Sequence, residues 1–227
     1  MSQALLKSPL VNGLIRTSRD QDWVAASPED PRERRVHLDL CAQDQMTGFA
    51  SGLQAEGFSL DLVINCTGLL HDQSLRPERT WGQIHPESMQ RSFHVHATGV
   101  AIAMAELIPC MPRDSRAIFA TLSARIGSIE DNRLGGWYSY RASKAAQNMI
   151  LKTASIEARR KWPKLCLVAL HPGTVRTDLS APFTQRLPND KVFHPDQSKD
   201  YLFRILEGLS SEDSGSFFAW DGSPIPW

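Results

Sequence analysis

The stretch LDLVINC, residues 60–66, decides the fold class of this 227-residue chain, because it is short and almost continuously apolar. An unbroken apolar run of this length is typical of a strand that is covered on both faces. Two later runs, RAIFATL (116–122) and KLCLVAL (164–170), have the same strand-like character. Strands of this kind, separated by longer amphipathic segments, indicate βαβ units and a parallel sheet in an α/β fold.

The remaining segments complete the alternation of strands and helices. Apolar positions recur at helical spacing within 86–109, and the segment 138–161 ends before Pro163. The chain length suits one domain with a sizeable core, so we expect a single domain over 1–227. The expected strands are 11–15, 34–40, 60–66, 116–122, 164–170 and 215–220, and the expected helices are 43–56, 86–109, 138–161 and 195–208.

The composition narrows the class of partner. Lys plus Arg and Asp plus Glu each number 25, which argues against a nucleic-acid or membrane-surface role driven by bulk charge. No apolar run approaches the length of a membrane span, and the N-terminus is too interrupted for a signal peptide. The four cysteines form no CxxC pair, and no histidine cluster has metal-ligand spacing. We therefore expect reduced thiols, no metal site and a cytoplasmic protein.

A helix in the second half of the chain carries a candidate acid/base. In GWYSYRASK (136–144), Tyr140 and Lys144 are four residues apart and share a helix face, whereas Tyr138 diverges from Lys144. An ammonium beside a phenol lowers the phenol's pKa from about 10 and makes it a general acid/base. The alternative is an ordinary helix surface, because this spacing alone is common.

The surrounding motifs favour the catalytic interpretation. YSYRASKAA, preceded by LSARIGS and followed by LHPGTVRTD, resembles the short-chain dehydrogenase/reductase family. LVINCTG resembles its Asn-x-x-Gly signature at Asn65 and Gly68, and HLDL resembles its adenine-contacting aspartate at Asp39. The segments DNRLGGWYSYRASKAA and FFAWDGSPIPW are most similar to the C-factor and sniffer-like carbonyl reductase branch. The resemblance implies a doubly wound, mostly parallel Rossmann-type sheet with helices on both faces.

The resemblance also implies roles for particular residues. Tyr140 would exchange a proton with a carbonyl or alcohol substrate, and Lys144 would lower the pKa of Tyr140 and bind the nicotinamide ribose. The loop with Pro172, Gly173, Val175 and Thr177 would hold the nicotinamide carboxamide. Hydride chemistry would belong to the cofactor.

The turn after the first expected strand indicates which cofactor binds. An acidic residue there selects NAD, whereas basic residues accommodate the 2′-phosphate of NADP. Ser18 and Arg19 occupy this turn and favour NADP, because a guanidinium pairs bidentately with phosphate. The alternative is a solvated arginine blunted by the adjacent Asp20.

Two catalytic positions depart from the family pattern. Counting back from Gly127 in Ser-x-x-Gly gives Ala124, so Ser123 or Ser128 must substitute, or Tyr140 must work without this partner. Losing one such donor costs about 3 kcal/mol of transition-state stabilisation. His96 stands where the family has the helix asparagine of a proton relay. It either relays protons or fills a helix bend as a structural residue.

The glycine-rich phosphate loop is the largest departure. The family's first strand and Gly-x-x-x-Gly-x-Gly have no counterpart, and MSQALLKSP resembles the end of the helix that follows them. The resemblance implies that roughly 20–25 residues are missing, through an internal start or truncation. The gap between the flanking strands would be about 10 Å at the usual strand spacing. We expect those strands either to slide together or to detach.

Two functions of different classes remain. The leading one is an NADP-dependent oxidoreductase for a small carbonyl or alcohol substrate, with Trp137 and Phe183 as pocket walls or, alternatively, as core. The other is a non-catalytic, cofactor-deficient signalling or interaction protein on the same scaffold. The helices 86–109 and 138–161 correspond to the pair through which many family members form homodimers, and the sequence does not distinguish a dimer from a monomer.

Overall fold

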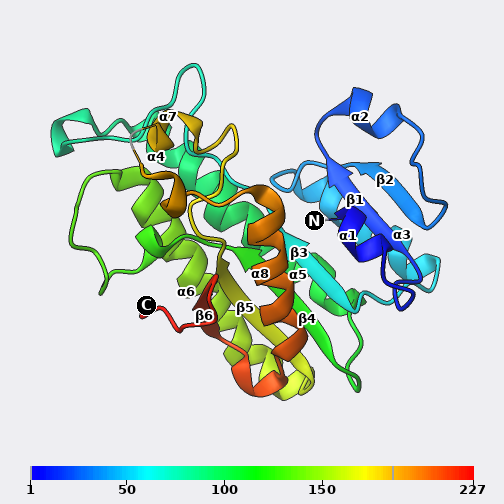
Figure 1. The fold of residues 1–227 in the computed structure, drawn as a ribbon. Helices are drawn as coiled ribbons and strands as arrows, with labels where there is room; N and C mark the ends of the chain where they lie inside the picture. Colours follow the sequence, from blue (N-terminus) through cyan, green and yellow to red (C-terminus); the bar gives the residue numbers. More distant parts are fainter. Residues whose placement is uncertain (1, 186) are drawn as a thin grey trace.

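The computed structural model describes residues 2–185 and 187–227, and its strands form two parallel sheets (Figure 1). The first sheet has the order β1-β2 and the second β3-β4-β5-β6. In the second sheet, Phe119 of β4 lies opposite Val63 of β3 and Leu167 of β5. The strands are β1 (Leu14–Ser18), β2 (Glu33–His37), β3 (Leu62–Asn65), β4 (Ala117–Leu122), β5 (Leu165–His171) and β6 (Ser216–Ala219).

The helices match the sequence prediction in most of their bounds. The two helices α6 (Tyr138–Lys161) and α8 (Pro195–Gly208) have the predicted bounds, and α3 (Gln43–Ala55) is one residue shorter. The strand predicted at 11–15 instead begins at Leu14. The predicted helix 86–109 is three pieces: α4 (Pro86–Phe93), the π-helical turn η2 (His94–Thr98) and α5 (Gly99–Leu107). Short helices α1 (Ser2–Leu6), α2 (Gln21–Ala25) and α7 (Ala181–Thr184) complete the set.

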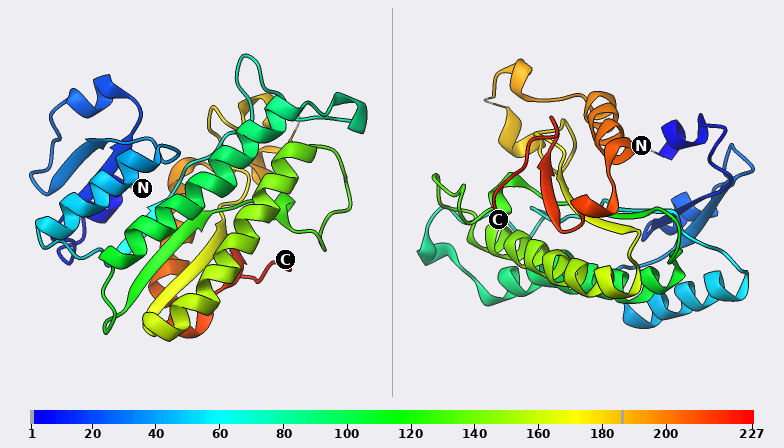
Figure 2. Two further views of the ribbon diagram at one scale, coloured as in Figure 1. Left: turned by 180° about the vertical axis from the view of Figure 1, so that it is seen from behind. Right: turned by 90° about the horizontal axis from the view of Figure 1, so that it is seen from below.

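The four-stranded sheet is covered on both faces, as its apolar strands predict (Figure 2). Alternate residues of a strand point to opposite faces, so Phe119 joins the core beneath α3, α5 and α6. Its neighbours Ile118 and Ala120 pack instead with Leu202 and Leu206 of α8. This two-sided burial explains why β4 and β5 read as unbroken apolar runs.

The division into two sheets decides between the two arrangements expected for the first strands. Of the two alternatives for the first strands, the structure has the second: β1 pairs with β2 alone, and β3 pairs with β4 alone. Leu62, Val63 and Ile64 of β3 are consequently half-buried, whereas the central residues of β4 are buried. Packing of α3 against α5, rather than strand pairing, attaches the two-stranded sheet to the larger one.

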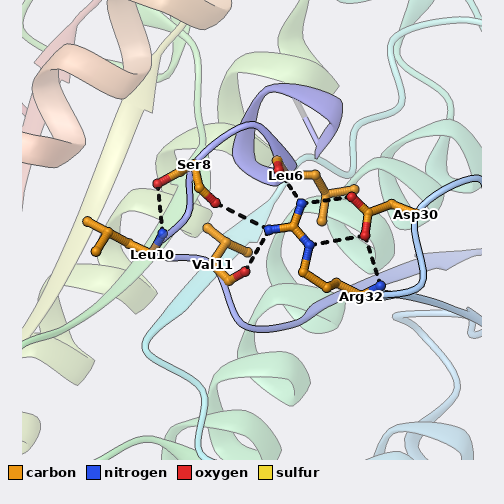
Figure 3. Close-up of polar contacts among 6 residues, drawn as sticks. All are labelled: Leu6, Ser8, Leu10, Val11, Asp30 and Arg32. Carbon is orange, nitrogen blue, oxygen red and sulfur yellow. Dashed lines mark hydrogen bonds and ion pairs between the residues drawn. The ribbon is translucent and has the colours of Figure 1, made fainter.

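A single arginine fastens the N-terminal segment to β2 (Figure 3). The Arg32 guanidinium donates to the backbone oxygens of Leu6, Ser8 and Val11 and to the Asp30 carboxylate. The carbonyls at a helix C-terminus lack intrahelical partners and carry partial negative charge, so a cation there is favourable. The hydrogen bond to Asp30 also raises the pKa of Arg32.

The sequence predicts no segment that is long and apolar enough to cross a membrane. By length and composition alone, this prediction is wrong. Among the described residues, the continuous helix Pro86–Cys110 meets that criterion, and 44% of its most apolar window is buried. Val100 and Met104 of this helix lie in the core under the sheet. The apolar side of the helix therefore has a partner within the fold, as core helices of soluble proteins do.

Candidate active site

Tyr140 and Lys144 lie one turn apart at the start of α6, and the hydrogen bonds of the lysine go to groups other than the phenol. Lys144 is buried, and its Nζ donates to the Leu122 carbonyl and to Gln147 Oε1, both at 2.9 Å. The distance from Nζ to the centroid of the Tyr140 ring is 6.0 Å. The lysine ammonium is thus directed to the carboxyl end of β4.

The protonation equilibria of this pair follow from burial. Burial raises the pKa of Tyr140 to about 12 and lowers the pKa of Lys144 to about 7. Both shifts disfavour the charged form, as expected when water is removed from an ionisable group. The expectation that Lys144 lowers the pKa of Tyr140 therefore does not hold for this arrangement, because the ammonium is not bonded to the phenol.

The two candidate substitutes for the missing serine both have other partners. Ser123 is buried, and its Oγ donates to Asn148 Oδ1 at 2.7 Å. Ser128 Oγ accepts from the Asp131 backbone N–H at 3.1 Å. Among the described residues, neither hydroxyl is hydrogen-bonded to Tyr140. The turn η4 (Arg125–Gly127) sits tightly on α6, since a Cβ at Gly127 would lie 2.8 Å from Lys144 Cβ.

His96 lies in the π-helical turn η2 and is fully buried beside Tyr140. The two rings meet edge to face with centroids 5.2 Å apart. His96 Nε2 accepts from the Leu69 N–H at 2.9 Å, which places the proton on Nδ1, 2.9 Å from Ser143 Oγ. Burial, with the nearby Lys144 charge, lowers the pKa of His96 to about 2. With both nitrogens bonded to protein, the structural alternative for His96 fits this geometry better than a relay.

Sequence reasoning missed a buried polar network beside Lys144. Gln147 Nε2 donates to Thr121 Oγ1 at 2.9 Å, and Asn65 Nδ2 donates to the same oxygen at 3.1 Å. Asn65 Oδ1 in turn accepts from the Thr67 N–H. Gln147 follows Lys144 by three residues, so its shared helix face was the available signal.

A second missed residue, Glu78, caps the start of α6. Its carboxylate is buried and accepts from the Ser139 N–H at 3.1 Å and from the Ser139 hydroxyl. Its carbonyl accepts from the Trp137 N–H. These groups would otherwise lack partners at a helix N-terminus, where negative charge is favourable. Glu78 is 61 residues from Ser139 in the chain, so no local pattern pointed to it.

The loop after β5 is held in a defined conformation. Gly173 has φ +77°, and a Cβ there would lie 2.5 Å from the Phe193 ring. Ser198 of α8 donates to the Pro172 carbonyl at 2.7 Å, and Val175 forms a bridge with Phe193. Thr177 is exposed, and its N–H donates to Ser180 Oγ. The predicted nicotinamide loop thus stands beside β4 and β6 at the carboxyl edge of the sheet.

The predicted adenosine-binding residues lie on the other sheet. Ser18 ends β1, and its Oγ accepts from the Asp20 N–H at 3.0 Å. The Asp20 carboxylate caps α2 through the Trp23 N–H, while Arg19 is exposed. Asp39 follows β2 and accepts from the Cys41 N–H. Tyr140, Lys144, His96 and Asn65 gather at the four-stranded sheet, with Gly68 in the loop after β3, whereas Ser18, Arg19 and Asp39 belong to the two-stranded one.

A series of ring contacts leads from Tyr140 to Trp137, Phe183 and His71. Trp137 and Phe183 are half-buried, with ring centroids 4.8 Å apart, and Trp137 lies 6.2 Å from Tyr140. His71 meets Phe183 at 5.6 Å, and its Nε2 is 3.1 Å from the Asp178 carbonyl. Trp137 and Phe183 are partly exposed and belong to neither buried core cluster.

The fold and the site define a Rossmann-type α/β protein with a tyrosine and a lysine at the carboxyl edge of its sheet. The sequence model of the short chain dehydrogenase family matches residues 14–188. The chain belongs to this family of oxidoreductases.

Sequence and structural similarity to individual proteins is consistent with this family. The chain is 32% identical to C-signal of Myxococcus xanthus over 146 residues, which are 64% of this chain and 82% of that protein. The NADPH-bound carbonyl reductase from chicken fatty liver superposes with a TM-score of 0.82 at 25% identity, over 100% of this chain and 92% of the other. The carbonyl reductase Sniffer of D. melanogaster has a TM-score of 0.83 at 20% identity, over 99% and 92%. The sheet and helices thus have the arrangement of sniffer-like carbonyl reductases.

Proposed function

We propose that the protein is an NADP-dependent carbonyl reductase in which Tyr140 is the general acid/base. The observation that carries the proposal is the placement of Tyr140 at the carboxyl edge of β4 and β5, beneath half-buried aromatic rings and beside Lys144. Ligands of open parallel sheets bind at this edge. Family membership adds the reaction class, transfer of a hydride between a nicotinamide and a carbonyl or alcohol.

The side chains present fit the two ends of NADP. Lys144 and the Pro172–Thr177 loop suit the nicotinamide riboside, and Arg19 beside Ser18 suits a phosphate on the adenosine ribose. NADPH in the chicken carbonyl reductase supports this choice of cofactor. Between the two ends, the described part of the chain has no glycine-rich turn leading into a helix, and the sheet is divided there. Binding of the cofactor's pyrophosphate is therefore the part of the proposal that an NADPH titration tests most directly.

The residues of the chain would handle the proton and the substrate. The bound cofactor would supply or accept the hydride. Tyr140 would deliver a proton from its hydroxyl, which its raised pKa keeps protonated at neutral pH. Lys144, with a pKa of about 7, would hold the nicotinamide ribose with whatever donors its protein contacts leave free. Trp137 and Phe183 would exclude water and favour an apolar or aromatic carbonyl compound.

The competing function is a cofactor-deficient interaction protein on this scaffold. Three observations favour it: Ala124 replaces the expected serine, the hydrogen bonds of Lys144 go to Leu122 and Gln147 and not to Tyr140, and the sheet is divided where the phosphate loop would lie. The two functions differ in whether the chain binds NADPH at all.

The test is titration of the purified protein with NADPH, followed by fluorescence and by thermal unfolding, and then an assay with an aromatic aldehyde. The proposal expects an NADPH-dependent rise in unfolding temperature, a weaker effect of NADH, and turnover that the Tyr140→Phe variant lacks. An unchanged unfolding temperature and fluorescence at saturating NADPH would favour the interaction protein. Binding without turnover would reject Tyr140 as the acid/base of this substrate class.

A further inference from the structure

We propose that Gln147 is a positioning residue for Lys144, tying the lysine ammonium to the loop after β3 through Thr121 and Asn65. The inference rests on the proposed function only for the role of Lys144 in cofactor binding. The hydrogen bond between Lys144 and Gln147 is observed directly in the structure. Gln147 is fully buried, and its Oε1 receives one of the lysine's hydrogen bonds at 2.9 Å.

The hydrogen bonds of Gln147 leave its amide a single orientation. Its Nε2 has two acceptors, Thr121 Oγ1 at 2.9 Å and the Leu122 carbonyl at 3.1 Å. A flipped amide would place its oxygen against the Leu122 carbonyl and its N–H groups against the lysine ammonium, so the nitrogen must face the sheet. The Oε1 atom is consequently presented to Lys144 Nζ.

The hydrogen-bond network continues from Gln147 to Asn65 of β3. Thr121 Oγ1 accepts from Asn65 Nδ2 as well as from Gln147, and Asn65 Oδ1 accepts from the Thr67 N–H. Thr121, Asn65 and Gln147 are all buried. A fully bonded buried network has few alternative arrangements, because each unpaired group inside it is costly. A change in the loop after β3 is therefore transmitted to the lysine through fixed side chains.

The network determines how many lysine donors remain. An ammonium has three N–H donors, and the Leu122 carbonyl and Gln147 Oε1 take two of them. One donor is left for a ligand. Gln147 thus sets the direction of that donor, and it stabilises the charged lysine in a site where burial favours the neutral amine.

Few other charged groups stand around Lys144. Elements packed on this part of α6 are α4, α5, η2, η4 and β5, together with α6 itself. Arg91 of α4 pairs with Asp72, Glu106 of α5 accepts from Thr47, and Arg125 of η4 pairs with Asp131.

His96 of η2 and His171 of β5 have pKa values lowered to about 2 and about 4, so both are neutral near pH 7. On α6, Tyr140 is a neutral phenol near pH 7, and Arg141 donates to carbonyls of Gly135, Gly136 and Ile126. Burial is therefore the main cause of the lowered pKa of Lys144, and its two acceptors are the bonded groups that oppose this effect.

The decisive experiment follows Lys144 directly in the cofactor-free protein. Protein with ¹³C-labelled lysine is titrated by NMR from pH 5 to pH 11, and the Lys144 signal is assigned by its loss in Lys144→Arg. Gln147→Glu places an anion beside the ammonium and should raise the Lys144 midpoint by about 1 pH unit or more. Gln147→Leu removes the acceptor and should lower the midpoint.

A matched control and a second variant complete the test. Ser155→Ala changes another buried residue of α6 far from Lys144, and its midpoint should equal that of the unaltered protein. Thr121→Val removes one of the two acceptors of Gln147 Nε2 and should shift the midpoint in the same direction as Gln147→Leu. Should Gln147→Leu fail to fold, Gln147→Glu and Thr121→Val still decide the matter. Equal midpoints in the unaltered, Gln147→Glu and Thr121→Val proteins would overturn the inference, whether or not the protein proves to be a reductase.

If NADPH binding is observed, the same variants separate positioning from fold maintenance. Gln147→Glu should weaken NADPH binding several-fold, because an ion pair to Glu would hold the lysine more firmly to the sheet. The change in the unfolding midpoint of Gln147→Glu should not account for its loss of NADPH affinity. Unaltered NADPH affinity in Gln147→Glu, together with a raised Lys144 midpoint, would overturn the link between Gln147 and the ligand-facing donor.

Discussion

Tyr140 and Lys144 stand one turn apart on α6, yet Lys144 donates to the Leu122 carbonyl and to Gln147, not to the phenol. Helical spacing brings two side chains to the same face, but the remaining contacts of each decide whether they meet. Here the end of β4 and the buried amide of Gln147 supply better acceptors than the protonated tyrosine does. A ligand at the carboxyl edge would have to compete with, or add to, these bonds.

Loss of the Tyr140 hydroxyl should remove turnover while NADPH binding remains. A general acid contributes about 10²- to 10⁴-fold to the rate, so we expect kcat of Tyr140→Phe to fall by that factor. Tyr138→Phe is the matched control two residues away, and its kcat should stay within about twofold of the unaltered value. Steady-state assays with NADPH titrations measure both. Equal losses in the two variants would point to damage of α6 and not to lost chemistry.

Removing the buried lysine should change the stability in a pH-dependent way, with the more favourable effect at low pH. The pKa of Lys144 is lowered from 10.5 to about 7, so between these values the unfolded chain binds a proton that the folded chain does not. Stability from this group therefore rises as pH increases through that window, and its cost is fully present below pH 7. We expect Lys144→Met to raise the free energy of unfolding relative to the unaltered protein by at least about 1 kcal/mol more at pH 6 than at pH 10.

Urea unfolding at the two pH values tests this sign. The Lys152→Met variant is the control, because Lys152 is on the same helix and donates only to the Gly215 carbonyl among the described contacts. The pH dependence of Lys144→Met is measured against that of this control. A larger stabilisation of Lys144→Met at pH 10 than at pH 6 would contradict the lowered pKa.

The cap supplied by Glu78 should be worth a measurable part of the stability of α6. Glu78→Ala leaves the Ser139 N–H and hydroxyl without their acceptor, and an unpaired buried group costs about 1–3 kcal/mol. Ser139→Ala removes only the hydroxyl and should cost less. A double-mutant cycle from urea unfolding should give a coupling energy above about 0.5 kcal/mol. Strict additivity of the two substitutions would show that the pair does not interact.

Two glycines should respond to alanine with opposite signs. Gly173 has φ +77°, and its Cβ would lie 2.5 Å from the Phe193 ring, so Gly173→Ala should destabilise the protein by more than about 1 kcal/mol. Gly52 lies within α3 with open space around its Cβ position, so Gly52→Ala should stabilise by about 0.5–1 kcal/mol. Thermal unfolding distinguishes them. A neutral Gly173→Ala would mean that the loop after β5 adjusts freely.

Local patterns predicted the elements well where a strong terminator accompanied the periodicity. Pro163 follows α6, and Pro195 stands at the first position of α8, so both helices have their predicted bounds. β1 begins at Leu14, three residues later than predicted, because the apolar pattern of 11–15 does not separate Val11 and Gly13 from the strand. The π-helical turn at His94–Thr98 was not predicted, since residue spacing does not reveal a single widened turn.

The candidate site divides in the same way. The sequence located Tyr140, Lys144, His96, Asn65 and the Pro-Gly loop, and the structure gathers them at the four-stranded sheet. It did not locate Glu78, whose partner is 61 residues away. Nor did it anticipate that Ser123 is already bonded to Asn148, because hydrogen-bond competition among buried groups depends on three-dimensional neighbours.

The sequence by itself determined the α/β class, the succession of strands and helices along the chain, and the helix face shared by Tyr140 and Lys144. These follow from the apolar periodicity and from the residues that end each element. Only the tertiary structure decided that the strands divide into two sheets, that Lys144 bonds to β4 and Gln147, and that burial separates the two pKa values. Those outcomes depend on which distant groups are brought within hydrogen-bonding distance, and on how much water packing removes.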